Sequence, residues 1–168
     1  MESTALALLG LGANLGDQPE QTLRQACRKV EQVPGIRSLV SASFYRSAPV
    51  DAPGPFYTNS AALVRTTLSP LNLLDSMQQI EHDFGRNRDL PSVRNAPRTL
   101  DIDILWYDGV QIDTPRIILP HPRMQLRAFV LKPLIELVGP DFNLHGVSLR
   151  DWQAKCQDQA CWRVEPAK

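Results

Sequence analysis

Segments patterned as strands and helices follow one another in the order strand, helix, strand, strand, helix, strand, and this order restricts the fold more than any other feature. Apolar or β-branched runs predict the strands, and apolar residues at helical spacing, bounded by Pro and Gly, predict the helices. We expect strands over 4–11, 36–46, 57–68 and 99–107, and helices over 19–33 and 70–84. The order is that of the split βαβ motif, so we predict an α+β protein with a ferredoxin-like β-α-β-β-α-β core.

Two further elements are expected after this core. Asp108-Gly109 predicts a hairpin turn that leads from the last strand into "VQID". The segment 126–138 predicts a C-terminal helix, in which Pro133 either kinks the helix or marks its start. No repeat or linker divides the chain, so we expect a single domain over residues 1–168. The polar tail from Gly139 shows no clear pattern.

Charge and cysteine content narrow the class of protein. Lys+Arg and Asp+Glu both number 18, and the zero net charge argues against broad electrostatic capture of nucleic acid or of an anionic membrane. No apolar run reaches the length of a membrane span, and we interpret the apolar N-terminus as a first strand rather than a signal peptide. The three cysteines, with no second Cys or His pair beside Cys156 and Cys161, favour free thiols in a reducing cytoplasm.

Two aspartates interrupt the apolar run "TLDIDILWY" at 99–107. In a strand, Asp101 and Asp103 point to one face and the alternating apolar residues point to the other. Like charges on one face repel each other and add nothing to a core. Mg²⁺ is usually held by one or two carboxylates together with substrate phosphates, and two aspartates so placed could converge on two ions. The alternative is a solvated strand face with a chance Asp-x-Asp pair.

The loop before this strand, 86–98, holds four arginines against one aspartate. Arginine binds phosphate oxygens in a bidentate way and stays charged. Anion-binding arginines that lead directly into a cation-binding carboxylate pair meet the needs of a metal–polyphosphate site, which we favour. The alternative is that Arg98 forms a structural salt bridge with Asp101 or Asp103. The four arginines are Arg86, Arg88, Arg94 and Arg98.

The glycines of "GLGANLGD" match neither a dinucleotide-binding fingerprint nor a P-loop, and we interpret them as a tight strand-to-helix turn. Tyr57 and Asn59 share a face at the start of the third strand, and Phe129 opens the late helix. A flat heterocycle could stack on such rings while an amide reads its edge. On spacing alone, ordinary core aromatics remain the favoured interpretation.

Six blocks in the same order resemble the 6-hydroxymethyl-7,8-dihydropterin pyrophosphokinases of folate biosynthesis. "RNAPRTLDIDIL" (94–105) resembles their signature, a basic residue, any residue, Gly or Ala, Pro, Arg, two residues and Asp-x-Asp. The other blocks are "GANLGD" (12–17), "SFYRSAPV" (43–50), "YTNSA" (57–61), "IEHDFGRNR" (80–88) and "PHPRMQLRAFVLKPL" (120–134). The resemblance implies a ferredoxin-like fold and transfer of the β,γ-pyrophosphoryl group of ATP to the pterin hydroxymethyl oxygen, with release of AMP.

The resemblance also implies roles for individual residues. Asp101 and Asp103 would hold two Mg²⁺ ions, and Arg86 and Arg98 would act with them in catalysis. ATP contacts are implied at Gln78, Arg88, Arg94, Arg98, Ile102, Arg116 and His121. Pterin contacts are implied at Ser47, Ala48, Val50, Tyr57, Asn59, Arg127 and Phe129. Glu81 would lie with Gln78 on the helix that borders both sites.

Two other functions stay open at this point. One is a nucleotidyl- or γ-phosphoryl-transferase with the same Asp-x-Asp pair on the same fold. The other is an RNA-binding or regulatory module, which should spread basic residues and exposed aromatics across its sheet. Because the basic residues cluster beside carboxylates, which would repel a nucleic-acid backbone, we expect small-molecule substrates and no nucleic acid. The lack of a long apolar run predicts no membrane contact. We expect a monomer, since members of the resembled family mostly act alone and no uncapped apolar stripe is left over.

Overall fold

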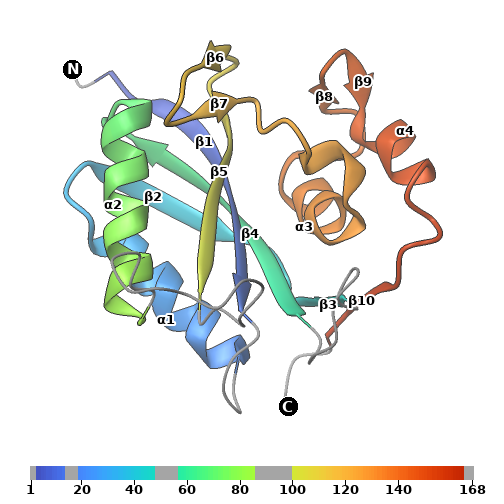
Figure 1. Cartoon of the computed structure of the whole chain (residues 1–168), viewed down its shortest axis with the longest axis horizontal. Helices are drawn as coiled ribbons and strands as arrows, with labels where there is room; N and C mark the ends of the chain where they lie inside the picture. The colour runs from blue at the N-terminus through green and yellow to red at the C-terminus, as the bar shows by residue number, and fades with distance from the viewer. Residues whose placement is uncertain (1–2, 14–18, 48–56, 86–99, 165–168) are drawn as a thin grey trace.

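An antiparallel six-stranded sheet forms the centre of the computed structural model, which describes residues 3–13, 19–47, 57–85 and 100–164. The strand order is β10-β3-β4-β1-β5, and β2 also pairs with β4 (Figure 1). The mixture of helices and antiparallel strands confirms the α+β class. The strands of the sheet are β1 (Ala5–Ala13), β2 (Ile36–Ser41), β3 (Tyr45–Ser47), β4 (Tyr57–Thr66), β5 (Asp101–Tyr107) and β10 (Cys161–Arg163).

A bulge divides the segment that the sequence predicts as one strand over 36–46. Ser41 pairs with Ala62 in β4 and Tyr45 pairs with Asn59, so three residues on this side of the ladder oppose two on the other. The Ser60 hydroxyl donates a hydrogen bond of 3.0 Å to the Ala42 carbonyl within the bulge. Because an extra residue reverses the alternation of side chains, β3 presents a different face from the one that a continuous strand would give.

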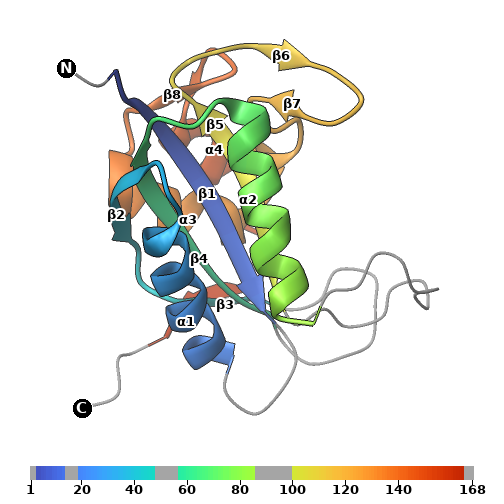
Figure 2. The ribbon, with the colours of Figure 1, turned by 90° about the vertical axis from the view of Figure 1, so that its left-hand side faces the viewer.

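The two helices predicted from the sequence both form, and they cover one face of the sheet side by side (Figures 1 and 2). They are α1 (Pro19–Gln32) and α2 (Pro70–Asp83). The Ser69 hydroxyl accepts a hydrogen bond of 3.2 Å from the Asn72 N–H and caps α2, and Pro70 fills the first helical position. The apolar stripes of both helices pack on alternate residues of β1 and β5 to form the first core.

The opposite face of the sheet is covered by the C-terminal part of the chain (Figure 1). Helix α3 (Ala128–Val138) follows a short 3-10 helix, η1 (Met124–Leu126), and packs with α4 (Leu149–Ala154) into a second core that includes Leu8 and Leu105. Pro133 lies inside α3 and does not mark its start, so that alternative of the prediction is wrong.

The added hairpin forms, but between other strands than predicted. Asp108 and Gly109 both have positive φ and make the expected turn. The "VQID" segment then pairs through β6 (Ile112–Asp113) with β7 (Ile118–Leu119), and not with β5 as predicted.

The tail after Gly139 contains a second hairpin, β8 (Asn143–Leu144) with β9 (Val147–Ser148), then α4 and the edge strand β10. Strand β10, near the C-terminus, therefore forms one edge of the six-stranded sheet, where it pairs with β3. The three cysteines are free thiols, as predicted. Among the helices in the described part of the chain, none combines the length and apolar character needed to cross a bilayer.

Candidate active site

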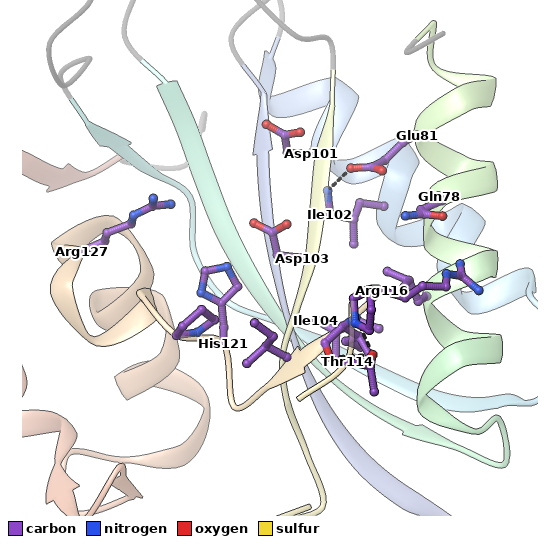
Figure 3. A pocket seen from close by; sticks show the side chains of 15 residues that line it. Gln78, Glu81, Asp101, Ile102, Asp103, Ile104, Thr114, Arg116, His121 and Arg127 are labelled. Atoms are coloured by element: carbon purple, nitrogen blue, oxygen red, sulfur yellow. Dashed lines mark hydrogen bonds between the residues drawn. The ribbon is translucent and has the colours of Figure 1, made fainter. Parts of the chain in front are cut away.

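The two aspartates lie on β5, an edge strand of the sheet, and point away from the first core. Leu100, Ile102 and Ile104 are buried in that core, whereas Asp101 is partly exposed and Asp103 is exposed. This alternation is the one predicted from the sequence. The pair is therefore presented on one face at the margin of the sheet (Figure 3).

Two glycines of β1 lie beside the aspartates. In the ladder between β1 and β5, Gly12 pairs with Asp101 and Gly10 pairs with Asp103. Both glycines lie inside β1: Gly10 falls within the strand predicted over 4–11, whereas for Gly12 the predicted strand-to-helix turn is wrong. Glycine inside a strand marks a place where a ligand or another backbone can approach closely. That pattern, two alternate glycines in an apolar strand, was the available signal for this feature.

Glu81 fixes the backbone between the aspartates. Its carboxylate accepts a hydrogen bond of 2.9 Å from the N–H of Ile102, and the side chain is 2 % exposed. Glu81 comes from α2, so the bond ties the helix to the outer edge of β5 (Figure 3). Farther along the same strand, the N–H of His121 donates a hydrogen bond of 2.8 Å to the carbonyl of Leu105.

A first cavity of about 460 Å³ runs along β5 between α2 and the segment that contains β7. It contains every described residue for which ATP contacts were implied: Gln78, Ile102, Arg116 and His121. The Arg116 guanidinium is held by the Asp75 carboxylate at 2.5 Å, with both side chains about half exposed. This cavity thus gathers a cation, an amide and an imidazole beside the aspartates.

A second cavity of about 650 Å³ lies on the face of the sheet beside α3. It contains every described residue for which pterin contacts were implied: Ser47, Tyr57, Asn59, Arg127 and Phe129. The Asn59 amide donates a hydrogen bond of 2.9 Å to the Ser47 hydroxyl, so its orientation is fixed within the buried wall. The Arg127 guanidinium lies 5.7 Å from the centre of the Phe129 ring.

The two cavities meet at the aspartates. Asp101, Asp103, His121 and Arg127 line both of them. A molecule in the first cavity and another in the second would therefore come closest to each other at two carboxylates, with an imidazole and a guanidinium alongside. This is the arrangement expected of a transferase for two substrates.

The environment of His121 favours its neutral form. Burial lowers the pKa of the imidazole, and the nearby charges of Arg127 and Arg123 lower the pKa further. Its Nδ1 accepts a hydrogen bond of 3.1 Å from the Arg123 N–H, which requires an unprotonated Nδ1. The remaining ring nitrogen can then act as a neutral donor.

The carboxylate pair has the donor chemistry that Mg²⁺ requires. Within the described ranges, no group of three or more His, Cys, Asp or Glu side chains gathers to hold a metal ion. Two carboxylates beside a cavity suit an ion that shares its remaining ligands with phosphates and water. The residues present therefore fit Mg²⁺ bound together with a polyphosphate.

Part of the predicted site lies outside the described residues: Arg86, Arg88, Arg94, Arg98, Ala48 and Val50. The suggested salt bridge of Arg98 lies outside them too. The second cavity also has members that the sequence did not suggest, among them Gly10, Gly12, Asp158 and Gln159.

Comparison with known proteins agrees with this geometry. Residues 8–139 match the family model for 7,8-dihydro-6-hydroxymethylpterin-pyrophosphokinase. The chain is similar to 2-amino-4-hydroxy-6-hydroxymethyldihydropteridine pyrophosphokinases from Methylorubrum extorquens, with 38% identity over 95% of this chain and 98% of the relative, and from Pseudomonas aeruginosa, with 40% identity over 95% and 96%.

Among solved structures, a Plasmodium falciparum HPPK-DHPS triple mutant with SDX-DHP is similar, with a TM-score of 0.69 and 14% identity. The match covers 92% of this chain but only 44% of that one. At this identity the likeness concerns the fold.

Proposed function

The chain belongs to the 7,8-dihydro-6-hydroxymethylpterin-pyrophosphokinase family, and we propose that it transfers the β,γ-pyrophosphoryl group of ATP to the hydroxymethyl oxygen of 6-hydroxymethyl-7,8-dihydropterin, releasing AMP. The observation that carries this proposal is the junction of two cavities at Asp101 and Asp103. Each cavity contains the described residues implied for one substrate, and the carboxylates stand where the substrates would meet.

The first cavity is the site for ATP in this proposal. Arg116 and His121 face the triphosphate, while Gln78 and Ile102 border the remainder of the nucleotide. A guanidinium offers the fork of donors that suits phosphate oxygens, and a neutral imidazole can donate a single hydrogen bond. The loop arginines Arg86, Arg88, Arg94 and Arg98 would complete the set of phosphate ligands.

The second cavity is the site for the pterin. The fixed amide of Asn59 suits the hydrogen-bonding edge of the heterocycle, and the rings of Tyr57 and Phe129 suit its faces. Ser47, with the backbone of Ala48 and Val50, would form the wall at the guanidine-like edge. Arg127 then lies beside the hydroxymethyl group and the phosphates, because it borders both cavities.

Asp101 and Asp103 would hold the Mg²⁺ that accompanies ATP, and we propose two such ions. When bound, Mg²⁺ neutralises phosphate charge and lowers the barrier to attack on phosphorus. The chain's own residues bind and orient the substrates so that the hydroxymethyl oxygen faces the β-phosphorus. Little covalent chemistry is left to the protein, so positioning and electrostatic stabilisation supply the rate enhancement.

The proposal also covers the topology of the fold, the oligomeric state and the cellular location. The order of the four core strands, β5-β1-β4-β2, with every neighbouring pair antiparallel, supports a ferredoxin-like β-α-β-β-α-β core. We also propose one domain over residues 1–168 and a monomer. Three free thiols support a reducing, cytoplasmic location.

Product analysis tests the proposed function. The purified chain is incubated with ATP, Mg²⁺ and 6-hydroxymethyl-7,8-dihydropterin, and the nucleotides are separated by ion-exchange chromatography. AMP and the pterin diphosphate should form in equal amounts. Formation of ADP would indicate γ-phosphoryl transfer, and release of free pyrophosphate would indicate nucleotidyl transfer; either result would refute the proposal.

A further inference from the structure

The last part of the chain reaches the second cavity although it follows the region that matches the family model. Asp158 and Gln159 line the cavity, and they lie between α4 and β10, beyond residue 139. These two residues therefore extend the site into a segment for which the resemblance implied no role.

The side-chain amide of Gln159 is hydrogen-bonded at both ends to the backbone around one residue. Its Oε1 accepts a hydrogen bond of 2.8 Å from the N–H of Ala128, and its Nε2 donates one of 2.8 Å to the carbonyl of Leu126. Leu126 and Ala128 are the two neighbours of Arg127 in the chain. Because each end of the amide finds the partner it requires, the pair of bonds fixes the amide in one orientation.

Arg127 lies at a break between two helices. Its own N–H donates to the Met124 carbonyl at 3.3 Å, and Gln159 binds the backbone groups on either side of it. Arg127 ends η1 and precedes the first residue of α3, with an extended backbone at φ −126° and ψ 117°. The Arg127 side chain makes no capping hydrogen bond to α3. The first N–H groups of a helix lack partners within the helix, and Ala128 is buried, so the Gln159 carbonyl oxygen satisfies a donor that water does not readily reach.

Gln159 is itself held on both sides. Its N–H donates a hydrogen bond of 3.0 Å to the carbonyl of Cys156, whose side chain is buried in the second core. On the other side, the Lys132 ammonium donates a hydrogen bond of 2.7 Å to the carbonyl of Cys161 in β10. The segment that carries Gln159 is thus hydrogen-bonded to α3 through Lys132, and its next residues form the edge strand β10.

We propose that Gln159 is a positioning residue that sets the backbone of Arg127 and so aims its guanidinium at the junction of the two cavities. The inference rests on the proposed function, in which Arg127 contacts the reacting groups. A group at the reacting centre must be placed to within a fraction of an ångström. Loss of the two hydrogen bonds from the Gln159 amide, to Ala128 and Leu126, therefore lowers turnover while the fold survives.

A double-mutant cycle between Gln159 and Arg127 tests the inference. The variants are Gln159→Ala, Arg127→Ala and the double variant, and Gln157→Ala serves as a control because that side chain is exposed on the same segment. AMP formation gives kcat and the KM of each substrate. We expect Gln159→Ala to lower kcat about tenfold or more, with the KM of ATP within about twofold of wild type.

In the Arg127→Ala background, the same change at Gln159 should alter kcat by less than about twofold, because the group it positions is gone. Gln157→Ala should match wild type. Equal losses in both backgrounds, or wild-type kcat for Gln159→Ala, would overturn the inference. An inactive wild-type chain would instead refute the proposed function, so the two failures are distinguishable.

If Gln159→Ala does not fold, Gln159→Glu replaces it in the cycle. The carboxylate still accepts the Ala128 N–H at the start of α3 but cannot donate to the Leu126 carbonyl. Reduced kcat with wild-type KM for ATP supports a positioning role for both hydrogen bonds of the Gln159 amide, and wild-type kcat contradicts it.

Discussion

The Glu81 carboxylate accepts a hydrogen bond of 2.9 Å from the N–H of Ile102, the residue between the two aspartates. Since successive side chains in a strand alternate, holding this peptide with the Ile102 side chain in the core holds Asp101 and Asp103 on the opposite face. The position of the two aspartates therefore depends on the hydrogen bond that Glu81 provides from α2.

Removal of the Glu81 acceptor should reduce both stability and turnover. Glu81→Ala leaves a buried N–H without this partner, and we expect the free energy of unfolding to fall by about 1–3 kcal/mol. Glu81→Gln keeps a side-chain oxygen as acceptor and should lose less than half as much. Urea unfolding and AMP formation measure the two effects. Equal losses for Gln and Ala would show that the Ile102 bond is not the important contact.

Removal of either aspartate should abolish turnover without unfolding the chain. Neither carboxylate packs in a core, and a partly exposed polar interaction contributes little, so Asp101→Ala and Asp103→Ala should change the free energy of unfolding by no more than about 1 kcal/mol. Turnover within about tenfold of wild type, roughly 1.4 kcal/mol of barrier, would argue strongly against metal ligation. Urea unfolding beside the AMP assay separates the two effects.

A methyl group at Gly12 should weaken binding of the pterin and spare ATP. A Cβ at Gly12 would lie 3.1 Å from the Asn59 Oδ1, and the Asn59 amide is held in place by Ser47. We expect Gly12→Ala to raise the KM of the pterin about fivefold, the effect of roughly 1 kcal/mol.

Gly10→Ala is the matched control, because the three atoms nearest to its Cβ all belong to the apolar side chain of Leu105, the closest at 3.2 Å, and none belongs to Asn59. The KM of the pterin should rise less in Gly10→Ala than in Gly12→Ala. If the KM of ATP rose as much as that of the pterin in Gly12→Ala, the assignment of the second cavity to the pterin would be wrong.

His121 should make stability depend on pH in mildly acidic solution. Its pKa in the folded chain is lowered, chiefly by burial, so the unfolded chain takes up a proton near pH 6.5 while the folded chain does not. The unfolded state then binds more protons, and stability is lost as the pH falls below the unfolded pKa.

The variant His121→Asn, whose amide oxygen can replace Nδ1 as acceptor for the Arg123 N–H, removes this contribution. Urea unfolding between pH 7.5 and 5.5 should show a steeper loss for wild type than for the variant. Parallel curves would contradict the lowered pKa.

The elements of the core and the face shared by the aspartates could be predicted, because both follow from local periodicity. The bulge between β2 and β3 could not, since residues 42–44 contain no Gly or Pro to signal a break and the bulge depends on pairing with β4. For the same reason Asp108-Gly109 predicted a turn correctly but assigned the wrong partner to β6.

The site was predicted unevenly. Asp101 and Asp103 stood out as charges within an apolar strand, whereas only the resemblance to a family connected Asn59 or Arg116 with them across long stretches of chain. Gly12 was misinterpreted because a glycine after an apolar strand can mark either a turn or a continuation of the strand with an open face. Gln159 has no pattern of its own, since its partners are backbone groups thirty or so residues away.

The most direct test of the account is a count of divalent ions bound between the two cavities. Mn²⁺ binds oxygen ligands as Mg²⁺ does and can be counted by electron paramagnetic resonance. In the presence of α,β-methylene-ATP, the wild-type chain should bind two Mn²⁺ ions, and the double variant Asp101→Asn/Asp103→Asn should bind fewer and more weakly. The same number and affinity in both proteins would contradict the central claim that these aspartates hold the metal at the junction of the substrates.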